Sequence, residues 1–229
     1  MTRGRWALVA LWALLVAGCT PVYTWDINTN STARPPSFDV GELSRQPVVT
    51  VALVAAGGLG GYNTTLSHAL VAALAEASPP IRAVPSHEIA NAVNDRGLES
   101  EYTELLAGFA RNGIMERERL QRIGSALGLR YLLLPGLAQV DHAILDRFEI
   151  TGIKVIRTRV TILRVWLQLW DMQTGHILWE SAGEVATSSE VLRHDRIVPL
   201  HDIAQKLWRR MIQHDLIEGG SGSRSLLDI

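Results

Sequence analysis

Histidine and aspartate stand side by side at three places in the sequence, and these pairs are the first candidates for catalysis or metal binding. Imidazole and carboxylate groups both ligate metals and both transfer protons. Adjacent residues of a helix point about 100° apart, so one such pair does not chelate an ion from a regular turn. We therefore expect solvated polar positions, no bound metal and no enzymatic activity from His194-Asp195, His201-Asp202 and His214-Asp215.

Two other stretches contain fragments of functional motifs. The segment Gly57-Gly58-Leu59-Gly60-Gly61 lies between an apolar run and a helical pattern, where a phosphate-binding loop would lie. However, the third glycine of GxGxxG would fall at Asn63, and no Gly-Lys-Ser/Thr follows. His87-Glu88 lacks the second histidine of HExxH, because Asn91 occupies that position. These mismatches favour a flexible turn at the glycines and no cofactor.

The only cysteine, Cys19, has surroundings that indicate a covalent lipid anchor. Arg3 and Arg5 are followed by the uncharged apolar run 6–16, which is typical of a secretory signal. The next segment, Leu15-Val16-Ala17-Gly18-Cys19, resembles the bacterial lipobox. The resemblance implies that residues 1–18 are a cleaved signal peptide and that Cys19 carries diacylglyceryl and N-acyl groups. The alternatives are an uncleaved anchor, or a soluble export signal in which Cys19 occurs by chance.

A lipid anchor makes the bilayer the first expected partner of the chain. Thr20 follows Cys19, whereas Asp at this position retains lipoproteins in the inner membrane of enteric bacteria, so we expect the periplasmic face of the outer membrane. The formal net charge of −1 gives no electrostatic footprint for nucleic acid. With Cys19 acylated, no thiol remains for a disulfide or a metal site.

The rest of the chain divides into three segments by composition. Residues 19–47 contain four prolines and no sustained apolar period, which predicts a flexible tether. The apolar run 48–54 predicts a buried strand, and we expect the folded domain over 48–218. Residues 219–229 begin with glycine and serine and are expected to form a disordered tail.

A long hairpin is the clearest pattern within the expected domain. Aliphatic and polar or aromatic residues alternate after Val160, and a turn with Gly175 at positive φ is expected before a return strand that reaches Val185. Helices are expected over 116–127, ended by Gly128, and again after Pro199. The sequence thus predicts an α/β (α+β) fold, a single domain in which helices pack on a mixed sheet with a long antiparallel hairpin.

Three segments together resemble a known group of bacterial envelope domains. They are IGSALGLRYLLLPG at 123–136, LQLWDMQTG at 167–175 and ILWE at 177–180. This pattern resembles the α/β domain shared by curli-export lipoproteins, penicillin-binding-protein activator lipoproteins and the amino-terminal domain of TolB. The resemblance covers about residues 48–213. It implies an anchored, non-enzymatic adaptor or assembly factor that binds an envelope protein.

Two narrower roles within that group remain as alternatives. A subunit of a curli-export-like outer-membrane secretion channel needs two amphipathic membrane hairpins, and 147–160 offers one interrupted candidate. A regulator of a peptidoglycan synthase uses a long tether to pass the cell wall, and the tether expected here is modest. Whether the chain forms a homo-oligomer is left open.

The candidate interface lies on the mixed face of the expected hairpin. Trp166 and Trp170 are spaced so that they share this face with Arg164 and Gln168. Tryptophan and arginine are enriched at binding hot spots, so these four residues are the predicted contact surface for the envelope partner. The alternative is that a helix or the 140s segment covers the two rings.

The lipid anchor can be tested by the substitution Cys19→Ser. Without the sulfur no acyl group can be attached, so the protein should leave the membrane fraction or accumulate as an unprocessed precursor. Metabolic labelling with palmitate should mark the wild-type chain and not the variant. Equal labelling of both chains would contradict the prediction.

Overall fold

The computed structural model describes residues 23–50, 53–55, 59–150, 153–191 and 198–220. The expected signal peptide, the lipobox and Cys19 lie outside the described residues, as does the tail from 221 onward. No helix in the described ranges is long and apolar enough to cross a membrane.

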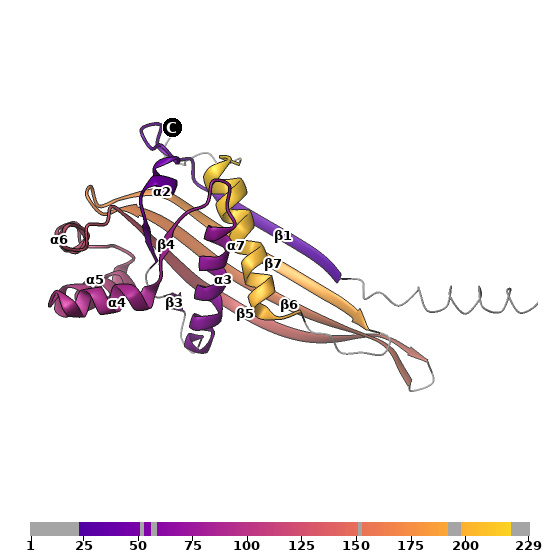
Figure 1. Ribbon diagram of the computed structural model, residues 1–229. Helices are drawn as coiled ribbons and strands as arrows, with labels where there is room; N and C mark the ends of the chain where they lie inside the picture. The colour runs from indigo at the N-terminus through magenta and orange to yellow at the C-terminus, as the bar shows by residue number, and fades with distance from the viewer. Residues whose placement is uncertain (1–22, 51–52, 56–58, 151–152, 192–197, 221–229) are drawn as a thin grey trace, which may run out of the picture.

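A seven-stranded mixed sheet forms the centre of the protein, and its order is β1-β7-β6-β5-β2-β4, with β3 also paired to β5 (Figure 1). Strands β1, β7, β6 and β5 are each antiparallel to the next, whereas β2, β3 and β4 run parallel to their neighbours. The expected mixed sheet is therefore confirmed. The strand bounds are β1 Tyr23–Ser31, β2 Val48–Thr50, β3 Val54–Ala55, β4 Ala83–Val84, β5 Tyr131–Ile150, β6 Ile153–Asp171 and β7 His176–Val191.

The predicted hairpin is confirmed as β6 and β7, which pair from Asp171 and His176 to Arg157 and Val191. Its turn is stabilised by Asp171, whose Oδ1 accepts hydrogen bonds from the backbone N–H groups of Gln173 (2.8 Å) and Thr174 (3.3 Å). Gly175 has φ 74°, a conformation that glycine adopts without steric cost. The turn and its glycine are thus as the sequence predicts.

One face of the sheet is covered by helices from opposite ends of the chain. Helix α3 (Asn63–Ala75) packs beside α7 (Leu200–Arg209), which continues as the π-helix η2 (Arg210–Ile217). The aliphatic positions of β6 face these helices. The resulting core includes the fully buried rings of Trp179 and Trp208 and the side chains of Leu163, Val165, Leu167 and Leu169.

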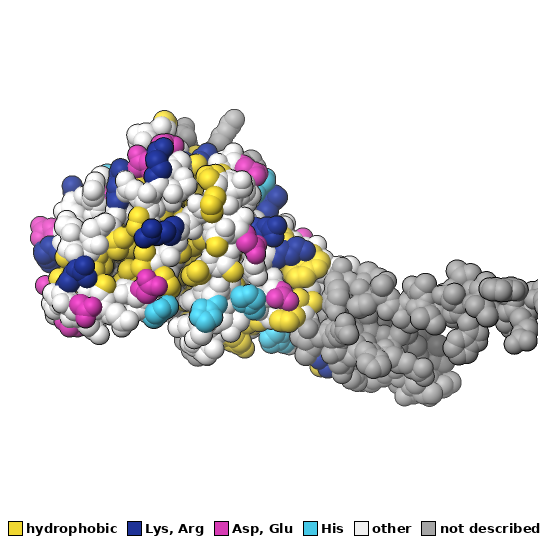
Figure 2. Space-filling view, in the orientation of Figure 1, with side chains coloured by type: hydrophobic (Ala, Val, Ile, Leu, Met, Phe, Trp, Pro, Cys, Tyr) yellow, Lys and Arg dark blue, Asp and Glu magenta, His cyan; other side chains and the backbone are white. Residues whose placement is uncertain are grey.

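The other face of the sheet is covered only at one end. Helices α4 (Ser86–Asp95), α5 (Glu99–Asn112) and α6 (Arg117–Leu127) form a second, smaller core there. Helix α6 ends at Gly128, which has φ 67°, as predicted. Strands β5, β6 and β7 extend beyond all the helices at the opposite end (Figure 1). Cationic and anionic side chains are interspersed on the face drawn in Figure 2, without a large area of one sign.

The flexible tether predicted for 19–47 is wrong over its described part. Residues 23–31 form strand β1, which pairs with β7 from Tyr23–Ser189 to Ser31–Ser181. Trp25 and Ile27 pack against the main core, while the alternate residues Asp26 and Asn28 are exposed. The polar composition therefore reflects an edge strand with one open face. A short helix follows, α2 (Glu42–Arg45), whose Leu43 is 1% exposed.

The substitution Leu43→Ala tests whether this amino-terminal segment belongs to the fold. Removing a fully buried leucine leaves a cavity, so the free energy of unfolding should fall by about 2–5 kcal/mol. Ser44→Ala, at the exposed neighbouring position, is the matched control and should change it by less than about 0.5 kcal/mol. Urea unfolding followed by tryptophan fluorescence measures both. Equal stability of the two variants would restore the tether interpretation.

Candidate functional site

Helix α5 covers part of the interface predicted on β6. Trp170 is only 4% exposed, and its ring meets the ring of Phe109 edge-to-face at 6.5 Å between centroids. Its indole Nε1–H donates to Gln168 Oε1 at 3.1 Å. Trp170 is therefore part of the second core, and the alternative in which a helix covers this ring is correct.

Trp166 is half-buried over a position that requires glycine. A Cβ atom at Gly136 would lie 1.8 Å from Cε2 of the indole, so the ring rests directly on the backbone of β5. The Phe109 ring packs beside it, with 6.0 Å between the ring centroids. Arg164 is exposed, ion-paired with Glu184 and hydrogen-bonded to Gln139 at 2.5 Å. Gln168 is half-buried and donates to Glu180. Contact of Arg164, Trp166 and Gln168 with a partner stays a prediction.

The histidine–aspartate pairs do not come together. His194-Asp195 lies outside the described residues, and His201-Asp202 lies in the first turn of α7. Asp215 is buried and accepts hydrogen bonds from Thr29 and Ser181, each at 3.2 Å, and contacts His214 Nδ1 at 2.8 Å. These contacts join η2 to the sheet, which is a structural role. Within the described ranges, no three His, Cys, Asp or Glu residues cluster closely enough to hold a metal.

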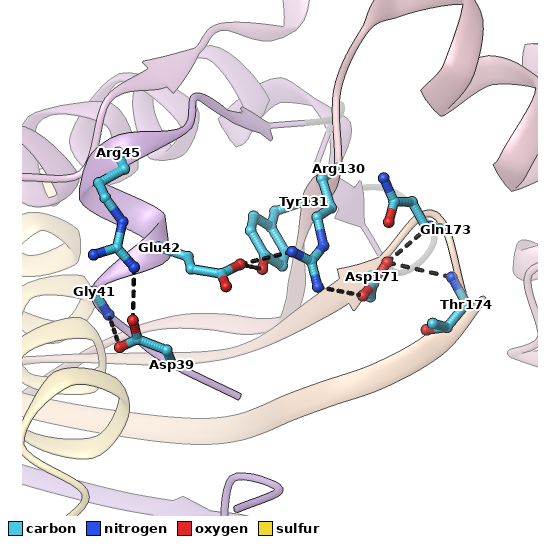
Figure 3. Close-up of polar contacts among 9 residues, drawn as sticks. All are labelled: Asp39, Gly41, Glu42, Arg45, Arg130, Tyr131, Asp171, Gln173 and Thr174. Atoms are coloured by element: carbon cyan, nitrogen blue, oxygen red, sulfur yellow. Dashed lines mark hydrogen bonds and ion pairs between the residues drawn. The ribbon is translucent and has the colours of Figure 1, made fainter. Parts of the chain in front are cut away.

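A polar cluster that the sequence interpretation missed lies where α2, β5 and the β6–β7 turn meet (Figure 3). Arg130 is its centre: Nη1 donates to Glu42 Oε2 at 2.7 Å, and Nη2 donates to Asp171 Oδ2 at 3.5 Å. The Tyr131 hydroxyl donates to the same Glu42 oxygen. The Arg130 guanidinium also lies 5.0 Å from the centroid of the Tyr131 ring. Three separate segments of the chain are thus held together by one guanidinium.

Asp39 adds a third carboxylate beside this cluster. Its Oδ1 accepts the backbone N–H of Gly41 at 2.9 Å, and its Oδ2 pairs with Arg45 Nη2 at 2.6 Å. These two interactions hold the pKa of the Asp39 carboxyl below its usual value. The group is therefore a carboxylate at neutral pH.

A pocket of about 400 Å³ opens over the cluster, and we call it the Arg130 pocket. Its lining combines three carboxylates and one guanidinium with an apolar wall. A second hollow of about 260 Å³ lies between α6 and the β6–β7 turn, and Arg130 lines both. The residues that line the Arg130 pocket include Phe38, Asp39, Glu42, Arg130, Asp171 and Ile177.

The sequence contains one signal that could have found this site. Arg130 and Tyr131 follow the glycine that ends α6, and Asp171 begins the turn motif, so both ends of the cluster lie next to recognised motifs. Glu42 had no such signal, because it lies in the segment interpreted as a tether. The contact that completes the cluster therefore depends on the fold.

Comparisons with known proteins give low similarities. No known protein family and no curated protein matches the chain. A variant of the PelC dodecamer from Paraburkholderia phytofirmans is 12% identical, covers 82% of this chain and 96% of its own, and has a TM-score of 0.45. A second PelC dodecamer structure from the same organism is 13% identical, with coverages of 82% and 95% and a TM-score of 0.40. Lipoprotein GNA1162 from Neisseria meningitidis is 14% identical, with coverages of 73% and 97% and a TM-score of 0.38. These values do not assign the chain to a family.

The Tyr131 hydroxyl gives the polar cluster a measurable pH dependence. Burial, assisted by the hydrogen bond to Glu42, raises the pKa of Tyr131 far above its usual value. The folded chain thus keeps a proton that the unfolded chain releases above about pH 10, so this group makes the free energy of unfolding fall as the pH rises further. Tyr131→Phe should make that fall shallower by up to about 1.4 kcal/mol per pH unit.

Urea unfolding at intervals between pH 9 and 11.5 measures this dependence. Tyr62→Phe removes a hydroxyl from a half-buried tyrosine outside the cluster and serves as the control. If the wild type and Tyr131→Phe lose stability equally with pH, the Tyr131 proton is not held as described.

Proposed function

We propose that this chain is a lipid-anchored envelope lipoprotein that acts as a non-enzymatic adaptor or assembly factor on the periplasmic face of the outer membrane. The main support for this proposal is the short stretch of sequence between Cys19 and the folded domain. Cys19, in its lipobox-like segment, precedes the first residue of β1 by only four positions. Four residues extend at most about 14 Å, so an acylated Cys19 would hold the folded domain directly against the bilayer.

The position of β1 in the sheet then gives the domain an orientation. Tyr23 pairs with Ser189, near the end of β7 and on the side where β5, β6 and β7 extend beyond the helices. This end would face the bilayer. The nine residues of β1 span about 30 Å, and the chain after them leads to α2 and the Arg130 pocket. The pocket would therefore face away from the lipid, where a periplasmic partner can reach it.

The chemistry of the pocket supports binding over catalysis. Arg130 and the Tyr131 hydroxyl both donate to Glu42 Oε2, and Arg130 also donates to Asp171, an arrangement that favours binding over proton transfer. An apolar wall next to fixed polar groups is instead typical of a recognition site.

The long hairpin supports a second candidate, a subunit of a secretion channel. Strands β5 and β6 have 20 and 19 residues, more than the 9–11 that a membrane strand needs. A channel of this kind requires several copies of the chain to form a homo-oligomer. Regulation of a peptidoglycan synthase is the less favoured role, because a four-residue spacer gives the domain little reach.

Crosslinking in intact cells tests the adaptor proposal. A tagged wild-type chain should recover a defined envelope protein after formaldehyde treatment, and Cys19→Ser should recover at least about tenfold less, because anchoring raises the local concentration of the partner. If neither chain recovers an envelope protein, the adaptor proposal is contradicted. A large oligomer of this chain alone, detected by light scattering of the detergent-solubilised protein, would favour the channel.

A further inference from the structure

We propose that the Arg130 pocket binds a lysine or arginine side chain presented by a peptide segment of the envelope partner. The inference rests on the proposed adaptor function and adds the chemistry of the contact. It follows from the charge balance, the shape and the apolar exposure of the pocket.

The pocket carries an excess of negative charge. Asp39, Glu42 and Asp171 line it, Arg130 is the one arginine or lysine among the described lining residues, and His176 also lies in the lining. Arg45 pairs with Asp39, and Arg130 pairs with both Glu42 and Asp171, so one carboxylate charge remains uncompensated within the cluster. Glu42 Oε2 accepts the hydrogen bonds from both Arg130 and Tyr131, so a further donor would bind at Oε1. An ammonium or guanidinium group meets both requirements, since it supplies positive charge and N–H donors.

The wall of the pocket suits the stem of a long basic side chain. Phe38 and Leu178 are half-buried there, and Ile177 is 41% exposed, one of the few large apolar side chains exposed in the described ranges. Lysine and arginine bury their methylene groups on apolar surface while the charged end reaches polar groups. A short acidic or purely apolar side chain would satisfy only one part of this lining.

The second hollow provides space for the backbone of the same peptide. It shares Arg130 with the pocket and is also lined by Gln121, Gln173 and residues at the end of α6. The carboxyl end of a helix carries partial negative charge, which again favours a basic segment. Because Arg130 lines both hollows, a peptide passing over it would place one side chain in the pocket and its neighbours beside α6.

A photo-crosslinker in place of Ile177 tests the inference in the anchored, full-length chain. Ile177 lines the pocket and has no part in the polar cluster, so p-benzoylphenylalanine at this position should leave the fold intact. Irradiation of intact cells followed by mass spectrometry should map the adduct to a segment of the envelope partner that contains lysine or arginine.

Charge reversal then decides whether the basic residue is the reason for binding. Asp39→Lys changes the sign of an exposed lining residue and should lower the adduct yield at least about fivefold, and a Lys→Glu or Arg→Glu change at the mapped partner position should restore it. Asp26→Lys, at an exposed carboxylate on β1 outside the pocket, is the matched control and should have no effect. Glu42→Gln provides a second, neutralising variant, and thermal melting of each variant establishes that it folds.

Four results would overturn the inference. They are an adduct on a segment without a basic residue, an adduct on residues 221–229 or on a second copy of this chain, a failure of the reversed pair to restore the yield, and no adduct at all. If formaldehyde crosslinking still recovers the partner in any of these cases, the adaptor proposal stands and only the pocket assignment fails.

Discussion

The packing of α3 against α7 on the aliphatic face of the sheet is the interaction on which the rest of the structure depends. These helices lie more than 120 residues apart in the chain, and both bury their apolar faces on the same side of β6. Fully burying one leucine contributes about 1.5–3 kcal/mol, and four β6 positions and two tryptophans are buried in this core. Once this layer is formed, β1 and α2 have a sheet edge and an apolar surface to join.

Local sequence patterns predicted the elements that form through interactions between residues close together in the chain. Alternation defined the hairpin, and glycines at positive φ ended the turn and helix α6, because each signal lies within a few residues of its effect. The segment 23–46 was misinterpreted, because an edge strand with one exposed face has the polar composition of a linker. Trp170 was misassigned for a different reason. Whether its face of the sheet is open depends on α5, about 60 residues earlier in the chain, and no spacing in the sequence reports that contact.

The Arg130 cluster is held rigid by contacts between three separate segments of the chain. Asp171 both caps the hairpin turn and pairs with Arg130, so the turn geometry and the ion pair fix one another. Glu42 connects this pair to α2, which Leu43 holds in the main core. The pocket walls therefore come from elements whose positions are set by burial, and a recognition surface built on such elements loses little entropy on binding.

The pairing of β1 with β7 has a consequence for the order of events during biogenesis. The strand nearest the amino terminus finds its partner only in residues 181–189, so the two strands have very high contact order. A chain that crosses a membrane from its amino terminus must wait for almost all of its length to emerge before the sheet can close. In the proposed lipoprotein, strand β1 would stay unpaired during this interval, which would leave time for acylation of Cys19, four positions before the strand.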